Sequence, residues 1–284
     1  MNPECNDVRV DRRSAWRLAG RFLLPVDPSR GADSPRWLGV GVWLPAWGLL
    51  IGAAYAASFR LLWLWLGEHQ HIRLAPMAAL LAIDVCWLGY RLLAGAATVA
   101  GSWPDRQIRS PSSSPVLAMV VFLVTAIVVK FALLVSLPAG AVTWPADWRQ
   151  HLRVLYPYVM YRPLILMPVW GRWAVLLAGT IGRVAPDGSD RLRQWAAGSR
   201  LTVVMTWWAA ITTLTVLYVS PTIFHVGWSV LISLGMLVVA YLASFVLARR
   251  FGGQTEATVT AAGWIVEMAF LLAYLPVARY IYWY

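Results

Sequence analysis

The sequence predicts an all-α integral membrane protein, a bundle of about seven transmembrane helices with its N-terminus on the cytoplasmic side. Composition is the first observation, because 60% of the residues are hydrophobic and 13% are charged. A soluble domain has about 45–50% apolar and about 25% charged residues. The second observation is an uncharged run, residues 201–248, which holds no Lys, Arg, Asp or Glu. It is long enough for two spans of about 20 residues each.

The apolar runs divide the chain into two parts, a basic tail over residues 1–36 and a polytopic membrane domain over residues 37–284. Each predicted span is an apolar run bounded by a more polar connection. The seven predicted spans are residues 39–66, 74–90, 116–137, 154–181, 201–219, 227–248 and 258–278.

Orientation is predicted from the arginines, because Lys and Arg near the ends of spans are retained on the cytoplasmic side. The tail and every second connection carry them, which places these segments in the cytoplasm and predicts a multi-pass protein of the inner (plasma) membrane. The arginines on this predicted side include Arg9, Arg12, Arg13, Arg17, Arg21, Arg30, Arg36, Arg106, Arg109, Arg183, Arg191, Arg193, Arg200, Arg249 and Arg250.

The tail mixes apolar and basic residues just before the first span. Trp16, Leu18 and Phe22 alternate with Arg17 and Arg21, a pattern typical of a helix that lies in the lipid headgroup region. A basic tail that only sets the topology would have a similar composition. Both interpretations make membrane lipid a partner of this segment.

The net charge of +11 does not indicate nucleic-acid binding, because the basic residues are scattered between apolar runs rather than gathered on one polar module. Cys5 and Cys86 are the two cysteines. Their positions form neither a disulfide framework nor a metal-ligand spacing.

Four charged residues stand out inside the predicted spans, Asp84, Lys130, Arg172 and Glu267, whereas Arg60 and Arg162 lie nearer span ends. A charged group in hydrocarbon costs at least about 2.5 kcal/mol by insertion scales. Such residues therefore either serve a function or pair with one another and hold the bundle together. The sequence leaves both alternatives open.

A basic, glycine-containing turn precedes the last span and contains Gly252, Gly253, Gln254 and Thr255. Glycines let the backbone approach an anion, and the N-terminus of the following helix offers free N–H groups. The turn is therefore a candidate phosphate-binding site. A basic turn between two membrane helices would equally well form without a ligand.

Three segments of the chain resemble the cobalamin synthase family (adenosylcobinamide-GDP ribazoletransferase). Residues 249–272 read RRFGGQTEATVTAAGWIVEMAFLL and are similar to the family's GGQTGD turn, T-x-G-A segment and final-span glutamate, with Thr258 and Glu267 in register. Residues 16–26 read WRLAGRFLLPV and resemble the family's F-x-T-R-L-P-V-P segment. Residues 88–101 read LGYRLLAGAATVAG and resemble LHLDGLADTADGLG.

The resemblance implies an Mg²⁺-dependent transfer that joins alpha-ribazole or its phosphate to GDP-cobinamide and releases GMP. The family's aspartates, which hold the metal and phosphates, fall on Arg91, Gly95, Thr98 and Ala257. Glu256 is the one carboxylate left as a candidate metal ligand. The residual substrate and phosphate contacts implied by the resemblance are Arg172, Gly252, Gly253, Gln254 and Thr255, with Arg91 as a further anion contact.

These replacements leave three hypotheses about function. The first is a synthase acting in late cobalamin biosynthesis. The second is a catalytically inactive relative that binds a corrinoid nucleotide or a partner membrane protein as a scaffold, because Mg²⁺ needs oxygen ligands and an arginine in their place would repel it. The third is a transporter, since polar groups that converge near the bilayer midplane are typical of transporters.

Overall fold

The computed structural model describes residues 12–24, 37, 39–67, 74–103, 114–137, 160–220 and 225–282. Most of the predicted tail and the first part of the predicted span 154–181 lie outside these residues. Within the described ranges the chain is helical, and the one extended pairing is an isolated bridge between Val184 and Gln254. The all-α fold class is therefore confirmed.

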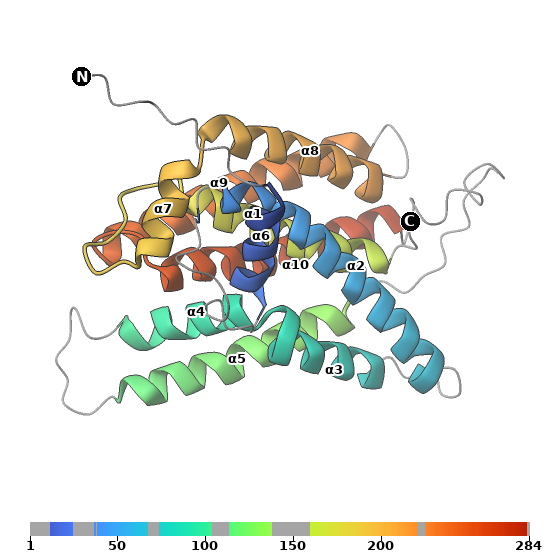
Figure 1. Ribbon diagram of the computed structural model, residues 1–284. Helices are drawn as coiled ribbons and strands as arrows, with labels where there is room; N and C mark the ends of the chain where they lie inside the picture. The colour runs from blue at the N-terminus through green and yellow to red at the C-terminus, as the bar shows by residue number, and fades with distance from the viewer. Residues whose placement is uncertain are drawn as a thin grey trace, which may run out of the picture.

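Ten α-helices are present in the described part of the chain (Figure 1). A short 3₁₀ turn, η1 (Val40–Trp43), precedes α2, and two π-helical segments, η2 (Trp63–Gly67) and η3 (Asp84–Leu88), follow α2 and α3. The helices are α1 (Arg12–Leu23), α2 (Leu44–Leu62), α3 (Leu74–Ile83), α4 (Tyr90–Ser102), α5 (Pro115–Val135), α6 (Tyr161–Ala178), α7 (Asp190–Gly198), α8 (Leu201–Val219), α9 (Val226–Arg250) and α10 (Glu256–Tyr282).

Five helical stretches among the described residues are long and apolar enough to cross a membrane: α2 with its flanking turns, α5, α8, α9 and α10. A sixth is the pair Leu74–Leu88 and Tyr90–Ser102, which is bent by 78°. The predicted span 74–90 is thus the first half of a broken element. Helix α6, the remaining predicted span, is not among these stretches. The chain is a multi-pass membrane protein, and the count of seven stays a prediction.

The helices form two layers, with α3, α4 and α5 in one and α2, α6, α8, α9 and α10 in the other (Figure 1). Helix α10 joins the layers because it packs against α4 as well as α6 and α9. Helix α6 is buried from Leu166 to Ala178. It packs closely on α2, where the small residues Gly48 and Gly52 face the backbone of α6. By contrast, α5 and α9 expose apolar side chains, as lipid contact requires.

The helix expected in the tail is present as α1, which runs crosswise to the long helices (Figure 1). Ala15, Leu18 and Leu23 on one face are buried, while Arg17 is exposed. The carbonyl of Trp16 accepts a hydrogen bond of 2.9 Å from the indole of Trp47 at the start of α2. Helix α1 therefore packs on the bundle, and its place in the headgroup region stays a prediction.

One end of the bundle gathers the ends of α4, α6 and α9 and the start of α10. Arg250 at the end of α9 lies over the ring of Trp103, at 5.2 Å from its centroid. The backbone N–H of Gln254 donates at 2.8 Å to the backbone carbonyl of Arg183, a residue that follows α6. Connections predicted to share one side of the membrane therefore meet in the structure. That this side is cytoplasmic remains an expectation from the arginine distribution.

Candidate functional site

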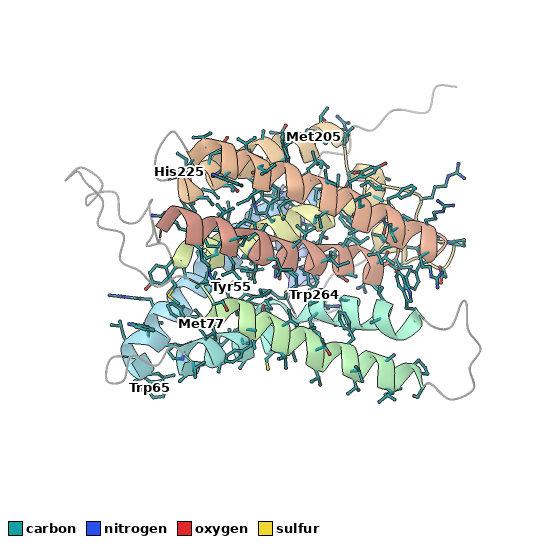
Figure 2. The ribbon with its side chains drawn as sticks, turned by 180° about the vertical axis from the view of Figure 1, so that it is seen from behind. Tyr55, Trp65, Met77, Met205, His225 and Trp264 are labelled. Carbon is teal, nitrogen blue, oxygen red and sulfur yellow. The ribbon has the colours of Figure 1, made fainter. Side chains whose placement is uncertain are left out.

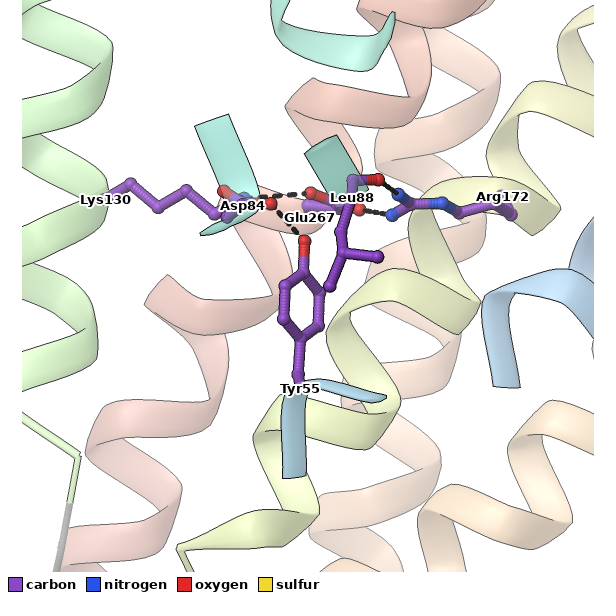
Figure 3. Close-up of polar contacts among 6 residues, drawn as sticks. All are labelled: Tyr55, Asp84, Leu88, Lys130, Arg172 and Glu267. Atoms are coloured by element: carbon purple, nitrogen blue, oxygen red, sulfur yellow. Dashed lines mark hydrogen bonds and ion pairs between the residues drawn. The ribbon is translucent and has the colours of Figure 1, made fainter. Parts of the chain in front are cut away.

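A cluster of acidic and basic side chains lies inside the bundle, where η3, α5, α6 and α10 meet (Figure 3). The ammonium of Lys130 is 2.6 Å from Asp84 Oδ2 and 3.3 Å from Glu267 Oε2. The second carboxylate oxygen of Glu267 pairs with Arg172 Nη1. All four side chains are at most 5% exposed. The four intramembrane charges singled out in the sequence thus form one chain of contacts.

Two further groups complete this cluster. The hydroxyl of Tyr55 on α2 donates to Asp84 Oδ1. Arg172 Nη2 donates at 2.8 Å to the carbonyl of Leu88. Leu88 is the last residue of η3, just before the chain turns into α4. A broken helix leaves backbone groups without their helical partners, and in hydrocarbon each must be satisfied within the protein. Arg172 therefore stabilises the break before α4 in addition to pairing with Glu267.

The cluster is charge-balanced, with two cations and two carboxylates. Isolated charges would be costly in a lipid environment, whereas paired and hydrogen-bonded charges are tolerated. The structure thus favours the pairing alternative for Asp84, Lys130, Arg172 and Glu267. A transport pathway would instead need polar groups lining an opening.

The glycine turn between α9 and α10 is fixed by its own backbone and by Gln254. Gly252 and Gly253 have φ values of 70° and 142°. The side-chain amide of Gln254 is 2% exposed and donates to the carbonyls of Ile181 and Ser244, each at 3.1 Å. Both amide hydrogens therefore join the turn to α9 and to the segment after α6, and neither is left for an anion.

Thr255 caps helix α10 through a reciprocal pair of hydrogen bonds. The backbone N–H of Thr258 donates to Thr255 Oγ1 at 3.2 Å, and the N–H of Thr255 donates to Thr258 Oγ1 at 2.8 Å. Such a cap occupies donors that a phosphate at a helix N-terminus would otherwise meet. The turn is thus a structural connection whose polar groups bond one another and the neighbouring backbone.

Replacing Gly253 by alanine is expected to lower the free energy of unfolding by about 1–3 kcal/mol. Its φ of 142° is rarely adopted by other residues, and an added Cβ would lie 2.6 Å from the backbone of Ala185. Thermal unfolding in detergent micelles measures the loss. Gly235→Ala on α9 is the matched control, because nothing lies within 4 Å of its added Cβ. Equal stability of the two variants would contradict the structural role of Gly253.

The two motifs that carry aspartates in the resembling family meet between α4 and α10. A Cβ on Gly95 would collide with Thr260 Oγ1 and lie 3.0 Å from the carbonyl oxygen of Ala257. Gly95 and Ala257 are therefore brought together, as the resemblance implies, but in close helix packing. Thr98 points away, is exposed, and donates to the carbonyl of Ala94 at 2.8 Å.

Arg91 lies one helical turn before Gly95 on the same face of α4. Its side chain is half-buried, and its Nε is buried without a hydrogen-bond partner among the described residues. By contrast, Arg172 does not join the glycine turn. It meets α10 at Glu267, 11 residues and thus about 16 Å along the helix from Glu256.

The residues at this junction do not fit Mg²⁺, which needs several oxygen ligands, usually carboxylates. Gly95 and Ala257 offer no side-chain oxygen. Glu256 Oε1 accepts a hydrogen bond of 2.5 Å from the hydroxyl of Ser189. Within the described ranges no group of three or more His, Cys, Asp or Glu side chains is close enough to share an ion.

Tyr55, Ser189 and Thr260 also belong to these sites, although no sequence pattern predicts it. A tyrosine in a span and a serine or threonine near a helix end are common, so their types carry no signal. Each of them nevertheless contacts a residue that the sequence analysis identifies: Tyr55 contacts Asp84, Ser189 contacts Glu256, and Thr260 lies against Gly95.

A comparison with models of protein families identifies the family to which the chain belongs. The model of the cobalamin-5-phosphate synthase family matches residues 115–275, more than half of the 284-residue chain. The chain belongs to the cobalamin-5-phosphate synthase family. No curated protein and no solved structure matches it.

Membership of the cobalamin-5-phosphate synthase family confirms the resemblance seen in the sequence and makes the chain a membrane protein of cobalamin biosynthesis. The match runs from the start of α5 into α10 and contains the glycine turn, Lys130, Arg172 and Glu267. Residues 16–26 and 88–101 lie outside it, so the correspondence of Arg91, Gly95 and Thr98 to family aspartates rests on the motif alone.

Proposed function

We propose that this chain is a non-catalytic member of the cobalamin-5-phosphate synthase family that binds a corrinoid nucleotide, GDP-cobinamide, during membrane-associated cobalamin assembly. The observation that carries the proposal is the packing of Gly95 against Thr260 and Ala257. Where the family's two aspartate motifs meet, Gly95 and Ala257 carry no carboxylate, the carboxylate of Glu256 is engaged by Ser189, and the packing at Gly95 leaves no space for a metal ion.

Loss of carboxylates bears directly on the family's reaction. Displacement of GMP from GDP-cobinamide by alpha-ribazole is a phosphoryl-type transfer, and such reactions depend on positioning and on neutralising charge, usually with metal ions. The family's route to charge neutralisation is therefore absent from these residues. This favours binding over turnover.

Binding of an anion is supported by Arg91. A guanidinium binds phosphate oxygens in a bidentate manner without a metal. The buried Nε of Arg91 lacks an acceptor in the described structure, and an unsatisfied buried donor costs about 1–3 kcal/mol. A pyrophosphate at this position would supply the missing acceptor and replace the family's metal with a fixed positive charge.

The test uses the full chain in lipid nanodiscs with GDP-cobinamide, alpha-ribazole and Mg²⁺. We expect no GMP release above that of empty nanodiscs. We also expect saturable GDP-cobinamide binding whose Kd rises about tenfold or more in Arg91→Gln, the loss expected for a hydrogen bond to a charged group. Chromatographic detection of GMP and equilibrium dialysis of the corrinoid measure the two quantities.

The control is Arg200→Gln, which removes an exposed arginine just before α8 and should leave the Kd unchanged. Mg²⁺-dependent GMP release by the wild-type chain would overturn the non-catalytic assignment. Absence of GDP-cobinamide binding, or binding that Arg91→Gln and Arg200→Gln weaken equally, would overturn the binding role.

A further inference from the structure

An apolar cavity of about 660 Å³ lies between α4, α5, α9 and α10. Phe122 of α5 and Trp264 of α10 form part of its wall, with ring centroids 5.3 Å apart. Figure 2 shows Trp264 between α10 and the layer of α4 and α5. Val246 and Leu242 of α9 also line the cavity and are about half exposed. The cavity is therefore open to the outside of the bundle, where lipid lies.

The chemistry of this cavity suits hydrocarbon. All 13 lining residues are Ala, Val, Leu, Ile, Phe or Trp. Water would find almost none of the two to four polar partners that hold it in a buried site. The volume is within the range of about 300–1,000 Å³ typical of sites that bind small organic molecules. In a membrane, an open apolar cavity of this size takes up an apolar chain.

One end of the cavity is basic. Trp103 belongs to the cavity wall, and the guanidinium of Arg250 lies over its ring. Arg249 is adjacent and exposed. Both arginines also suit the negative C-terminal end of the α9 dipole. Stacking of Arg250 on Trp103 nevertheless places its charge at the cavity, next to a site for an apolar chain.

We propose that this cavity binds one acyl chain of an anionic phospholipid, with the headgroup phosphate at Arg249 and Arg250. An apolar cavity with a cationic end is complementary to a molecule with an apolar chain and an anionic end. The arginine distribution predicts that this end faces the cytoplasm, and the cytoplasmic leaflet is the one rich in anionic lipid. This site is separate from the proposed GDP-cobinamide role and does not depend on it.

The experiment places the full chain in nanodiscs made of equal parts phosphatidylglycerol and phosphatidylcholine. A trace of either lipid carries a photoreactive diazirine in one acyl chain. We expect the phosphatidylglycerol probe to label the cavity residues of α4, α5, α9 and α10 in excess over the exposed face of α8. Ala243→Phe fills the cavity and should reduce this labelling to the level of α8, whereas Ala209→Phe on the exposed face of α8 should not.

Charge is tested with Arg249→Gln and Arg250→Gln combined, against Arg183→Gln and Arg200→Gln combined as the control with equal charge loss. The preference for phosphatidylglycerol should fall by about fivefold for each arginine removed at the cavity. Equal labelling by the two lipids in the wild-type chain would overturn the anionic ligand. Labelling spread evenly over α5, α8 and α9 would overturn the site itself, even if Ala243→Phe failed to fold.

Discussion

Replacing Glu267 by glutamine is expected to lower the free energy of unfolding by about 3–5 kcal/mol, the cost of breaking a buried ion pair. Glu267 contacts both Lys130 and Arg172, and all three side chains are buried. Without its charge, the cluster would hold two cations and one carboxylate, that of Asp84, which pairs with Lys130. Arg172 would then be left as an unpaired charge inside the bundle, held by the carbonyl of Leu88 alone among the partners described.

Titration with SDS in mixed micelles measures this loss. Glu256→Gln is the control, because this carboxylate lies at the end of the bundle, is only partly buried and accepts from a serine. The double variant Glu267→Leu with Arg172→Leu removes a complete pair and should be more stable than Glu267→Gln. If Glu267→Gln and Glu256→Gln were equally stable, the cluster would not be a main source of stability.

The same cluster bears on transport. Its charges lie near the break between α3 and α4, and broken helices with charged residues at mid-membrane are found in transporters. Here, however, each of the four charges contacts another, and Tyr55 and Leu88 take up further hydrogen-bonding positions. The cavity nearby is lined by apolar side chains. The arrangement favours a structural role.

Most of the helices could be predicted because length and apolar composition suffice to define a membrane span. The broken element could not be predicted in the same way. Residues 74–90 were predicted as one span, but the chain bends by 78° at its end, between Leu88 and Tyr90, and continues as a helix to Ser102. Apolar composition carries no information on direction, and the bend is stabilised by Arg172, which is distant in the sequence.

The candidate site was predictable in part for a similar reason. The cost of a charge in hydrocarbon singles out Asp84, Lys130, Arg172 and Glu267 without a structure. Which of these residues pair with one another depends on how four helical segments pack, and no local sequence pattern predicts that packing. The use of Gln254 was also hidden, because its partners, Ile181 and Ser244, lie on the segment after α6 and on α9.

Restoring the family's carboxylate at position 95 is expected to destabilise the chain by about 3 kcal/mol or more, through overpacking and burial of a charge. In Gly95→Asp the first added atom would already collide with Thr260 Oγ1 and crowd the carbonyl of Ala257. The two helices would have to separate, although their contact joins the two layers of the bundle. Thermal unfolding in detergent micelles measures the effect.

Ala257→Asp provides the contrast, because it restores the family's other carboxylate at a partly exposed position in the first turn of α10. A negative charge there is favoured by about 0.3–1 kcal/mol, so this variant should be as stable as the wild type. Gly95→Ala adds only the Cβ atom at the same position. Thr260→Gly should restore part of the stability that Gly95→Ala loses, since it removes the nearest colliding atoms. If Gly95→Asp instead folded normally and released GMP with Mg²⁺, α4 and α10 would have room for the metal. The packing of Gly95 could then no longer account for a loss of catalysis.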